Sequence, residues 1–414
     1  MKESESRQSR PTTHPLKVCM VTAYPPRVGG IATYASELIR AIKRYDHVIE
    51  VICHPDAEVG GHENQKNVYG LMDIERAGWE RIVFKKIQDL QPDVVHIQHE
   101  YGLYATEGDY GVPIIDLLFL LHVYRVPSVI TYHSVYSTLS RAESAFTSLS
   151  LAVASAGIVH EEFQKIFLPA NLGWIPGNVY VIPHGAKTTV SEAVPPVLES
   201  KKVYGISDKK VVLCMGWWEP NKRFEDVVKI WPEIVREVPD TVLVIAGDAR
   251  PGSPSGGFYK PTLLKAIEES PAKDRIKVIT GAFNPKEYDT ILNMADMVVL
   301  PYDRASQSGN LAHSFALGKP AVVTAVEGLK AEVEASDAGV AVPLGSIEDL
   351  KVAILTLLKD DELRKRYSKR ALEYVKKEIG WSHVAQKHAQ LYETVVEKEQ
   401  LNRTAVARPD TIRG

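Results

Sequence analysis

The stretch "MADMVVLPYDRASQSGNLAHSFALGKPAVVTAV" (294–326) decides the fold of this chain. A short apolar run is followed by a polar loop of small residues, a helix-forming segment that ends at Gly-Lys-Pro, and a second apolar run. Apolar runs on either side of one helix predict two parallel strands joined by a crossover. Ser308 is suited to cap the helix, which leaves the backbone N–H groups of Gly309, Asn310 and Leu311 near its start. A strand, a small-residue turn and a helix N-terminus are the parts of an anion site, and an ordinary well-capped core helix is the alternative.

The same alternation of strands and helices extends over the chain in two series. The first occupies residues 16–186 and the second residues 206–378, with a polar, Pro-containing linker at 187–205 between them. Continuous Val/Ile runs separated by helices predict parallel sheets that are covered on both faces. The predicted fold class is α/β, with two doubly wound, Rossmann-like domains facing across a cleft, and ligands of such sheets bind outside the carboxyl ends of the strands. Residues 1–15 and 401–414 are predicted to be disordered tails.

Composition and charge narrow the class of protein. The 414 residues carry a net charge of −3, which argues against a general nucleic-acid binder. Cys19, Cys53 and Cys214 each lie in an apolar, strand-like run, and we expect reduced core thiols in a reducing compartment. The polar N-terminus has no apolar signal-peptide region, and the longest apolar run (114–123) contains Asp116 and is too short to span a bilayer. We therefore expect a cytoplasmic enzyme, with peripheral contact at the inner membrane face left open.

In the first domain, candidate residues follow the predicted strands. Gly29 and Gly30 precede a helix and would let a ligand approach the backbone, although a turn that needs a positive φ is the alternative. His133 is the first residue after a strand, where it is either functional or a structural histidine.

A second group of candidates lies in "QHEYGLYATEGDYG" (98–111), directly after another strand. His99, Glu100 and Tyr101 begin this loop. Mixed aromatic and polar groups suit sugar rings, which have apolar faces and hydroxyl edges. The alternative is an ordinary solvated loop.

In the second domain, "GWWEPNKRF" (216–224) follows a strand that ends at Gly216. Lys222 and Arg223 come just before a helix, where the macrodipole disfavours cations unless an anion is bound. Two cations at this position suit a diphosphate, and a solvated basic pair is the alternative.

The order and spacing of these segments resemble the GT-B glycosyltransferases, specifically glycosyltransferase family 4, over residues 16–398. No single segment is decisive, but the full series in this order is specific. The segments that carry the resemblance are the Gly-Gly loop, "VIPHGA" (181–186), "CMGWWEPNKRFEDVV", "LVIAGDA", "ITGAFNPKEYDTILNMADMVVLPY", "GLKAEVEASDAGVAV" and "WSHVAQKHAQLY".

The resemblance implies that the C-terminal domain binds a nucleotide diphosphate sugar and the N-terminal domain binds the acceptor, with a helix at 379–400 crossing back to the N-terminal domain. It implies transfer with retention of anomeric configuration, in which the leaving phosphate takes the acceptor proton. His133 corresponds to the family's histidine near the donor sugar and Lys222 to its diphosphate-binding lysine, and these are the predicted catalytic residues. The predicted donor-binding residues are Gly30, Gly216, Arg223, Gln307, Ser308, Gly309, Asn310 and His313, and the predicted acceptor-binding residues are Gly29, His99, Glu100 and Tyr101.

Two departures from the family pattern bear on activity. The arginine that the family carries after the strand-end glycine is Trp217 here, and Arg223 is a candidate to supply the missing charge. The family also carries E-x-F-G-x-x-x-x-E, whose glutamates contact the sugar hydroxyls and the nucleotide ribose. Counting back from Gly318 places these glutamates at Ala305 and His313, and anchoring on the preceding glycine places them on two serines. Neither alignment supplies a glutamate, so the donor cannot be identified from this motif.

The predicted function is a retaining hexosyltransferase, with mannosyl or glucosyl transfer favoured on family frequency, acting on a sugar, lipid-linked or other hydroxyl acceptor. Its main task is to stabilise the leaving diphosphate. No acidic cluster follows the strands, so we expect no metal and no cofactor, and the missing carboxylate pair argues against a glycoside hydrolase. The alternatives are a GT-B nucleotide-sugar epimerase or a non-catalytic GT-B partner subunit. A two-domain solute-binding protein is disfavoured by the absent signal peptide, and the oligomeric state is left open.

Overall fold

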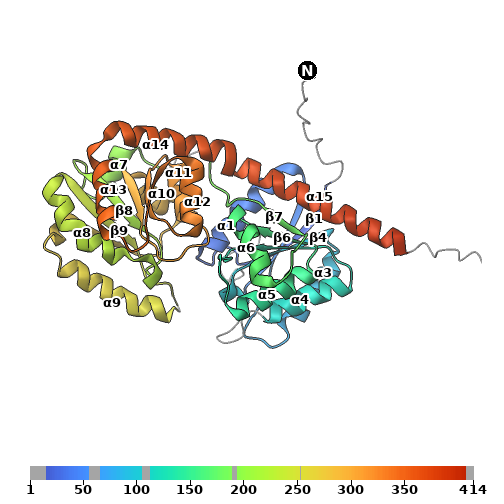
Figure 1. Cartoon of the computed structure of the whole chain (residues 1–414). Coiled ribbons are helices and arrows are strands. Elements are labelled where there is room, and N and C mark those ends of the chain that lie inside the picture. Colours follow the sequence, from blue (N-terminus) through green and yellow to red (C-terminus); the bar gives the residue numbers. More distant parts are fainter. Residues whose placement is uncertain (1–14, 56–65, 105–111, 189–193, 252, 407–414) are drawn as a thin grey trace, which may run out of the picture.

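The computed structural model of the chain contains two parallel β-sheets, one in each half (Figure 1). It describes residues 15–55, 66–104, 112–188, 194–251 and 253–406. The seven-stranded sheet has the order β3-β2-β1-β4-β5-β6-β7 and the six-stranded sheet the order β10-β9-β8-β11-β12-β13. All strand pairs in both sheets are parallel. The predicted fold class of two doubly wound, Rossmann-like domains is therefore confirmed.

The N-terminal domain carries helices on both faces of its sheet. Alternate residues of β1 point to opposite faces, so that Cys19 packs with α3, α4 and α5 while Met20 packs with α1 and α15. Its strands are β1 (Lys17–Val21), β2 (Val48–Cys53), β3 (Val68–Gly70), β4 (Val94–His99), β5 (Ser128–Tyr132), β6 (Ala156–Val159) and β7 (Val179–Val181). Its helices are α1 (Gly30–Ile42), α3 (Trp79–Leu90), α4 (Val112–Val123), α5 (Arg141–Val153) and α6 (Glu162–Leu172).

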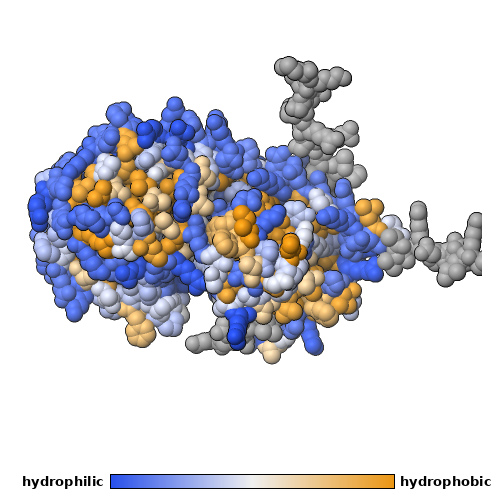
Figure 2. Space-filling model, viewed as in Figure 1, coloured by the Kyte–Doolittle hydropathy of each residue, from blue (hydrophilic) through white to orange (hydrophobic). Residues whose placement is uncertain are grey.

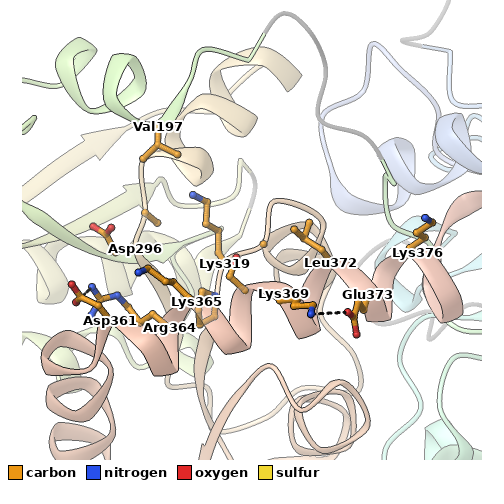
Figure 3. Close-up of a pocket in the computed structure, with 14 residues that line it drawn as sticks. Val197, Asp296, Lys319, Asp361, Arg364, Lys365, Lys369, Leu372, Glu373 and Lys376 are labelled. Carbon is orange, nitrogen blue, oxygen red and sulfur yellow. Dashed lines mark hydrogen bonds and ion pairs between the residues drawn. The ribbon is translucent and has the colours of Figure 1, made fainter.

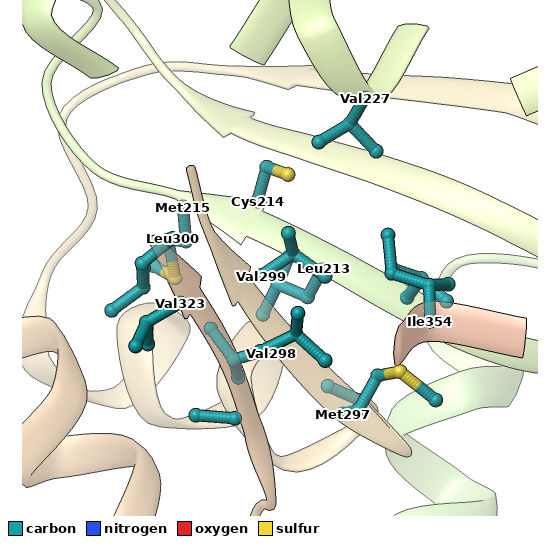
Figure 4. Packing of buried hydrophobic residues seen from close by; sticks show 14 of the residues in the cluster. Leu213, Cys214, Met215, Val227, Met297, Val298, Val299, Leu300, Val323 and Ile354 are labelled. Carbon is teal, nitrogen blue, oxygen red and sulfur yellow. The ribbon is translucent and has the colours of Figure 1, made fainter. Parts of the chain in front are cut away.

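The C-terminal domain has the same plan around a continuous apolar core, part of which Figure 4 shows between β8, β11 and α13. Cys214 is buried there and forms no disulfide, and the same holds for Cys19 and Cys53 in the N-terminal sheet, which matches the predicted core thiols. Its strands are β8 (Lys210–Met215), β9 (Thr241–Gly247), β10 (Ile276–Thr280), β11 (Met297–Leu300), β12 (Ala321–Thr324) and β13 (Gly339–Val342). Its helices are α7 (Val197–Val203), α8 (Phe224–Glu237), α9 (Pro254–Glu268), α10 (Pro285–Asn293), α11 (Gly309–Ala316), α12 (Glu327–Ser336), α13 (Ile347–Lys359) and α14 (Asp361–Tyr374).

A long C-terminal helix, α15 (Trp381–Val406), crosses back to the N-terminal domain, as the resemblance implies (Figure 1). Its buried face includes Val384 and Tyr392, which pack with α1 and β1. The hydroxyl of Tyr392 lies 2.6 Å from Nδ1 of His96 on β4. The helix continues to Val406 and so extends six residues into the predicted C-terminal tail, as the last turns of one continuous helix whose residues 401–404 are exposed. The rest of that tail, residues 407–414, lies outside the described residues.

The linker between the domains is shorter than predicted. Its second half forms α7, whose Lys201 Nζ donates to Asp296 Oδ2 at 2.8 Å, just before β11. The same carboxylate accepts from the backbone of Val211 at 2.6 Å, so α7 belongs to the C-terminal domain. The two chain crossings between the domains are tied together, because Ala186 N donates to Ile379 O and Trp381 N donates to Ala186 O.

Candidate active site

The strand order reverses at one point in each sheet, between β1 and β4 and between β8 and β11. Open α/β sheets bind ligands at such switch points, beyond the carboxyl ends of the strands. The loops after β1 and β4 carry Gly29, Gly30 and Glu100, and the loops after β8 and β11 carry Lys222 and Gln307. The fold thus brings candidates from four separate loops to the carboxyl ends of the two sheets.

Loops of the two domains touch each other at this cleft. The hydroxyl of Ser306 donates to the carbonyl of His133 at 2.9 Å. The guanidinium of Arg304 lies 3.7 Å from the ring centre of Tyr136. These contacts place His133 beside the loop that leads into α11.

Lys222 is a desolvated cation at the end of the short helix η4 (Pro220–Lys222). Its ammonium lies 3.7 Å over the ring centre of Tyr302, which follows β11. Burial, followed by the positive charge of Arg250, lowers the pKa of Lys222 to about 8, while the charges of Glu219 and Asp303 act in the opposite direction. Among the described residues no carboxylate forms an ion pair with Lys222. A desolvated ammonium without an anionic partner is suited to bind a diphosphate.

Arg223, the neighbouring cation, is already paired within its own helix. Its Nε donates to Asp226 Oδ2 at 3.0 Å, and its NH1 lies 3.4 Å from Glu225 Oε1. The structure therefore gives no support to the prediction that Arg223 replaces the missing family arginine. The cation that acts on Lys222 is instead Arg250, three residues after β9.

Arg250 was missed by the sequence analysis, although its position is a readable signal. It stands at the carboxyl end of a strand, in "GDAR", where ligand contacts are expected. Its positive charge also lowers the pKa of Glu100 in the other domain, against the larger effect of burial, which raises it.

Ser308 caps α11 as predicted, but it uses one of the N–H groups expected to be open. Ser308 Oγ accepts from Leu311 N at 3.3 Å, and Ser308 O accepts from the same N–H at 3.0 Å. The prediction is therefore wrong for Leu311. The described part of the chain offers no acceptor to the N–H groups of Gly309 and Asn310, which keep the expected character of a helix N-terminus.

The side chain of Asn310 fixes the start of α11 to the sheet. Its Nδ2 donates to Met215 O at 2.7 Å, and its Oδ1 accepts from the hydroxyl of Tyr288 at 2.5 Å. A Cβ on Gly216, whose φ is +138°, would lie 2.7 Å from Asn310 Nδ2. A side chain at position 216 would prevent this close approach, so a glycine is needed there. Gly216 and Asn310 therefore hold the start of α11 in place and do not offer an open polar group to a ligand.

Histidines follow four neighbouring strands of the N-terminal sheet: His99 ends β4, and His133, His160 and His184 come after β5, β6 and β7. The ring of Tyr34 on α1 packs beside three of them, with its centre 4.9 Å from those of His133 and His184. We call these five residues the histidine row. His133 is the member that meets the C-terminal domain at the cleft, because its carbonyl accepts from Ser306.

The side chain of His133 is fully engaged within the histidine row and is 2% exposed. Its Nε2 donates to Gln98 Oε1 at 2.8 Å, and its Nδ1 lies 3.3 Å from His160 Nε2. Burial lowers the pKa of His133 well below the usual range and that of His160 to about 4. Both rings are therefore neutral near pH 7.

His99 lies in the core, which contradicts its predicted contact with an acceptor. The side chain is 1% exposed, and its ring stacks on Phe146 with centres 4.2 Å apart. Tyr101 packs edge-on against the same histidine at 4.9 Å. Burial lowers the pKa of His99 to about 3. Glu100 begins the loop beyond them, where it accepts hydrogen bonds from Tyr101 N and the hydroxyl of Ser134.

The Gly-Gly loop leaves open space above it. A Cβ on Gly29 or Gly30 would meet no atom within 4 Å, and Gly29 has an extended φ of 160°. A positive-φ turn therefore does not explain this pair. The predicted approach of a ligand to Gly29 and Gly30 stays a prediction.

Neither family glutamate is replaced at its own position. Ala305 is buried, and the ring of His313 lies 5.8 Å from that of Tyr288. Burial lowers the pKa of His313, with Glu37 acting in the opposite direction. The remainder of loop 98–111, from residue 105, lies outside the described residues.

A groove of about 630 Å³ lies at the other end of the strands of the C-terminal sheet, away from the cleft (Figure 3). It is lined by Asp296 and Lys319, which precede β11 and β12, and by residues of α14. Lys319 donates to Asn293 O at 2.7 Å, and Arg364 bonds to Asp361. The groove is therefore at the amino ends of the strands and is not the cleft described above. In the described ranges no group of three His, Cys, Asp or Glu side chains could hold a metal ion, and metal independence stays a prediction.

Two facing Rossmann-like domains, with a desolvated lysine and a helix N-terminus at the switch point, define the GT-B class of glycosyltransferases. The chain belongs to glycosyltransferase family 4: residues 28–190 match the family described as "Glycosyltransferase Family 4" and residues 197–374 match "Glycosyl transferases group 1".

Named relatives are glycosyltransferases. An N-acetyl-alpha-D-glucosaminyl L-malate synthase of Bacillus anthracis is 27% identical over 48% of this chain, which spans half of that relative's length. A phosphatidyl-myo-inositol mannosyltransferase of Mycolicibacterium smegmatis is 25% identical over 92% of this chain and 94% of its own. The structure of HepE from Anabaena in complex with UDP and glucose aligns with a TM-score of 0.73 at 16% identity, covering 92% of this chain and 100% of HepE. The chain is a glycosyltransferase by family.

The surface of the N-terminal domain carries apolar side chains where α4, α5 and α6 lie (Figure 2). They include Phe119, Leu149 and Ile166, each more than half exposed. Within the described ranges, no helix combines the length and the apolar character needed to cross a bilayer. Peripheral contact with a membrane stays a prediction.

Proposed function

We propose that this protein is a retaining hexosyltransferase that uses a nucleotide diphosphate sugar. The observation that carries the proposal is the desolvated, unpaired ammonium of Lys222 in the same cleft as the free N–H groups of Gly309 and Asn310. Both kinds of group favour negative charge. A diphosphate leaving group gains negative charge as the anomeric bond breaks, so these groups stabilise the transition state more than the ground state.

The nucleotide and the hexose are proposed from relatives. HepE was solved with UDP and glucose, and the mycobacterial relative is named as a mannosyltransferase. Mannosyl and glucosyl donors are therefore the first to test, with a sugar, a lipid-linked molecule or another hydroxyl compound as acceptor. The leaving phosphate takes the acceptor proton, which fits a cleft where His133 has both ring nitrogens engaged.

A panel of UDP- and GDP-linked sugars tests this proposal. We expect one of them to raise the melting temperature of the full chain and to be consumed when a hydroxyl acceptor is added. Product analysis by NMR should show the anomeric configuration of the donor, and chelation with EDTA should leave the rate unchanged. An inverted product would refute retention.

The same panel separates the alternatives. An epimerase would change the sugar without an acceptor, and a non-catalytic partner subunit would bind the donor without turnover. Failure of every nucleotide sugar to bind the wild-type protein would refute donor use altogether.

A further inference from the structure

A glutamate that follows a neighbouring strand lies beside the α11 loop, although both family glutamates are absent. Glu327 is the first residue of α12 and follows β12. The next residue, Gly328, lies against the α11 loop, because a Cβ on it would be 2.3 Å from Ser306 O and 3.0 Å from Gln307 Cα. This packing brings the backbone of Glu327 beside that of Gln307.

The two oxygens of the Glu327 carboxylate have different surroundings. Oε1 accepts from the backbone N–H of Ser137 at 3.2 Å and from the hydroxyl of the same residue. Oε2 is buried and has no hydrogen-bond partner among the described residues. Gln307 Oε1, on the adjacent loop, is also buried without a partner there.

Two unpartnered acceptors on adjacent loops call for donors. Leaving one buried polar group unsatisfied costs about 1–3 kcal/mol, and more for a charged group. A diphosphate cannot satisfy them, because it is an anion that only accepts hydrogen bonds. Sugar hydroxyls can satisfy them, since each donates one O–H.

We propose that Glu327, with Gln307 beside it, binds hydroxyl groups of the transferred sugar and so takes over the contact that the family makes through the missing glutamates. This inference rests on the proposed function. Ser137 is a positioning residue: it belongs to the N-terminal domain and holds Oε1, so the domains must be together for the carboxylate to be oriented.

The substitution Glu327→Gln tests the contact without breaking the link to Ser137. The new amide keeps a carbonyl oxygen that can accept from Ser137, but it replaces the free acceptor by an NH₂ donor. Calorimetry on the full chain should compare the donor sugar nucleotide with the corresponding nucleoside diphosphate. We expect Glu327→Gln to weaken the sugar nucleotide about tenfold or more while the nucleoside diphosphate changes less than about twofold.

Two further variants and one analogue complete the test. Glu334→Gln, an exposed position of the same helix, is the matched control and should leave both affinities unchanged. Ser137→Ala should weaken the sugar nucleotide less than Glu327→Gln does. A deoxy-sugar donor that lacks the contacted hydroxyl should bind the wild-type protein more weakly than the full donor and bind Glu327→Gln as well as the full donor does.

Each contrary result has a distinct meaning. Equal loss of sugar nucleotide and nucleoside diphosphate in Glu327→Gln would overturn the proposal and leave Glu327 as a link between domains. Unchanged affinity for both would overturn it too and assign Oε2 to a bound water. If the wild-type protein binds nucleoside diphosphates but no nucleotide sugar, the proposed function fails before the role of Glu327 is reached.

Discussion

The two sides of the cleft treat their polar groups differently. On the N-terminal side, His133 bonds to Gln98 and lies within hydrogen-bonding distance of His160, so its ring is satisfied by other side chains. On the C-terminal side, Lys222 has no ion-pair partner and Gln307 Oε1 no hydrogen-bond partner among the described residues. Buried polar groups in proteins are normally paired. Lys222 and Gln307 therefore keep groups that a ligand can pair with, whereas the ring of His133 is already held by its neighbours.

The largest expected effect comes from removing the unpaired cation. Lys222→Ala should lower the rate of glycosyl transfer by about two orders of magnitude or more, because it removes the charge opposite the leaving diphosphate. Steady-state kinetics with the donor found in the panel measure this, and circular dichroism checks the fold. Lys265→Ala, on the exposed face of α9, is the control. Near-normal turnover of Lys222→Ala would remove Lys222 from the mechanism.

Only part of this difference between His133 and Lys222 could be predicted from the sequence. The parallel sheets followed from Val/Ile runs, and Lys222 and Ser308 followed from their positions after strands. The short edge strands β3 and β13 were missed, because "VYG" and "GVAV" are too brief to show periodicity. His99 was misassigned because a strand-end histidine reads the same whether its ring points into the core or into the cleft.

Pairwise electrostatics lay beyond the sequence. Nothing in "NKRFED" shows that Arg223 turns back on Asp226 while Lys222 lies over Tyr302. The effect of Arg250 on Lys222 and the contact of Glu327 with Ser137 became visible only when separate strand ends were brought together in space. Strand-end position is thus a sound guide to candidate sites, and the pairing of charges decides among them.

The buried histidine row should make the folded protein less stable in acid. His160 has a pKa of about 4 in the folded protein, against about 6.5 in an unfolded chain. The unfolded state therefore binds a proton first as the pH falls, and stability is lost between pH 6.5 and 4. For this residue alone the loss of unfolding free energy at pH 4.5 is about 2–3 kcal/mol relative to pH 8.

Urea unfolding of His160→Gln measures this contribution. The variant should be less stable than wild type at pH 8, and the difference should shrink or reverse by pH 4.5. His122→Gln, at an exposed position, is the control. A parallel decline of wild type and His160→Gln from pH 8 to 4.5 would show that His160 is not buried in its neutral form.

Binding of the donor near Lys222 should weaken at alkaline pH. Lys222, with a pKa of about 8, loses its proton as the pH rises from 7 to 9, and a bound diphosphate favours the protonated form. Donor affinity should therefore fall about tenfold over that interval, as the charged fraction falls. Lys222→Arg should bind with little pH dependence. Arg250→Gln should shift the decline to higher pH, because the positive charge of Arg250 depresses the pKa of Lys222. A flat wild-type profile would contradict this account.

The smallest effect is expected at Arg223, the cation that the sequence could not distinguish from Lys222. Its guanidinium is held by Asp226 and Glu225, so its charge is neutralised before a ligand arrives. Its backbone is left-handed, with a φ of 52°, so an alanine there would add strain unrelated to charge. Arg223→Asn is the better variant, since asparagine tolerates this conformation.

We expect Arg223→Asn to change kcat/KM less than about threefold, in the range of an exposed ion pair. A loss as large as that of Lys222→Ala would mean that the guanidinium leaves Asp226 when the donor binds. In that case the two cations would act together, and the division between a paired and an unpaired charge at the start of α8 would hold only for the ligand-free protein.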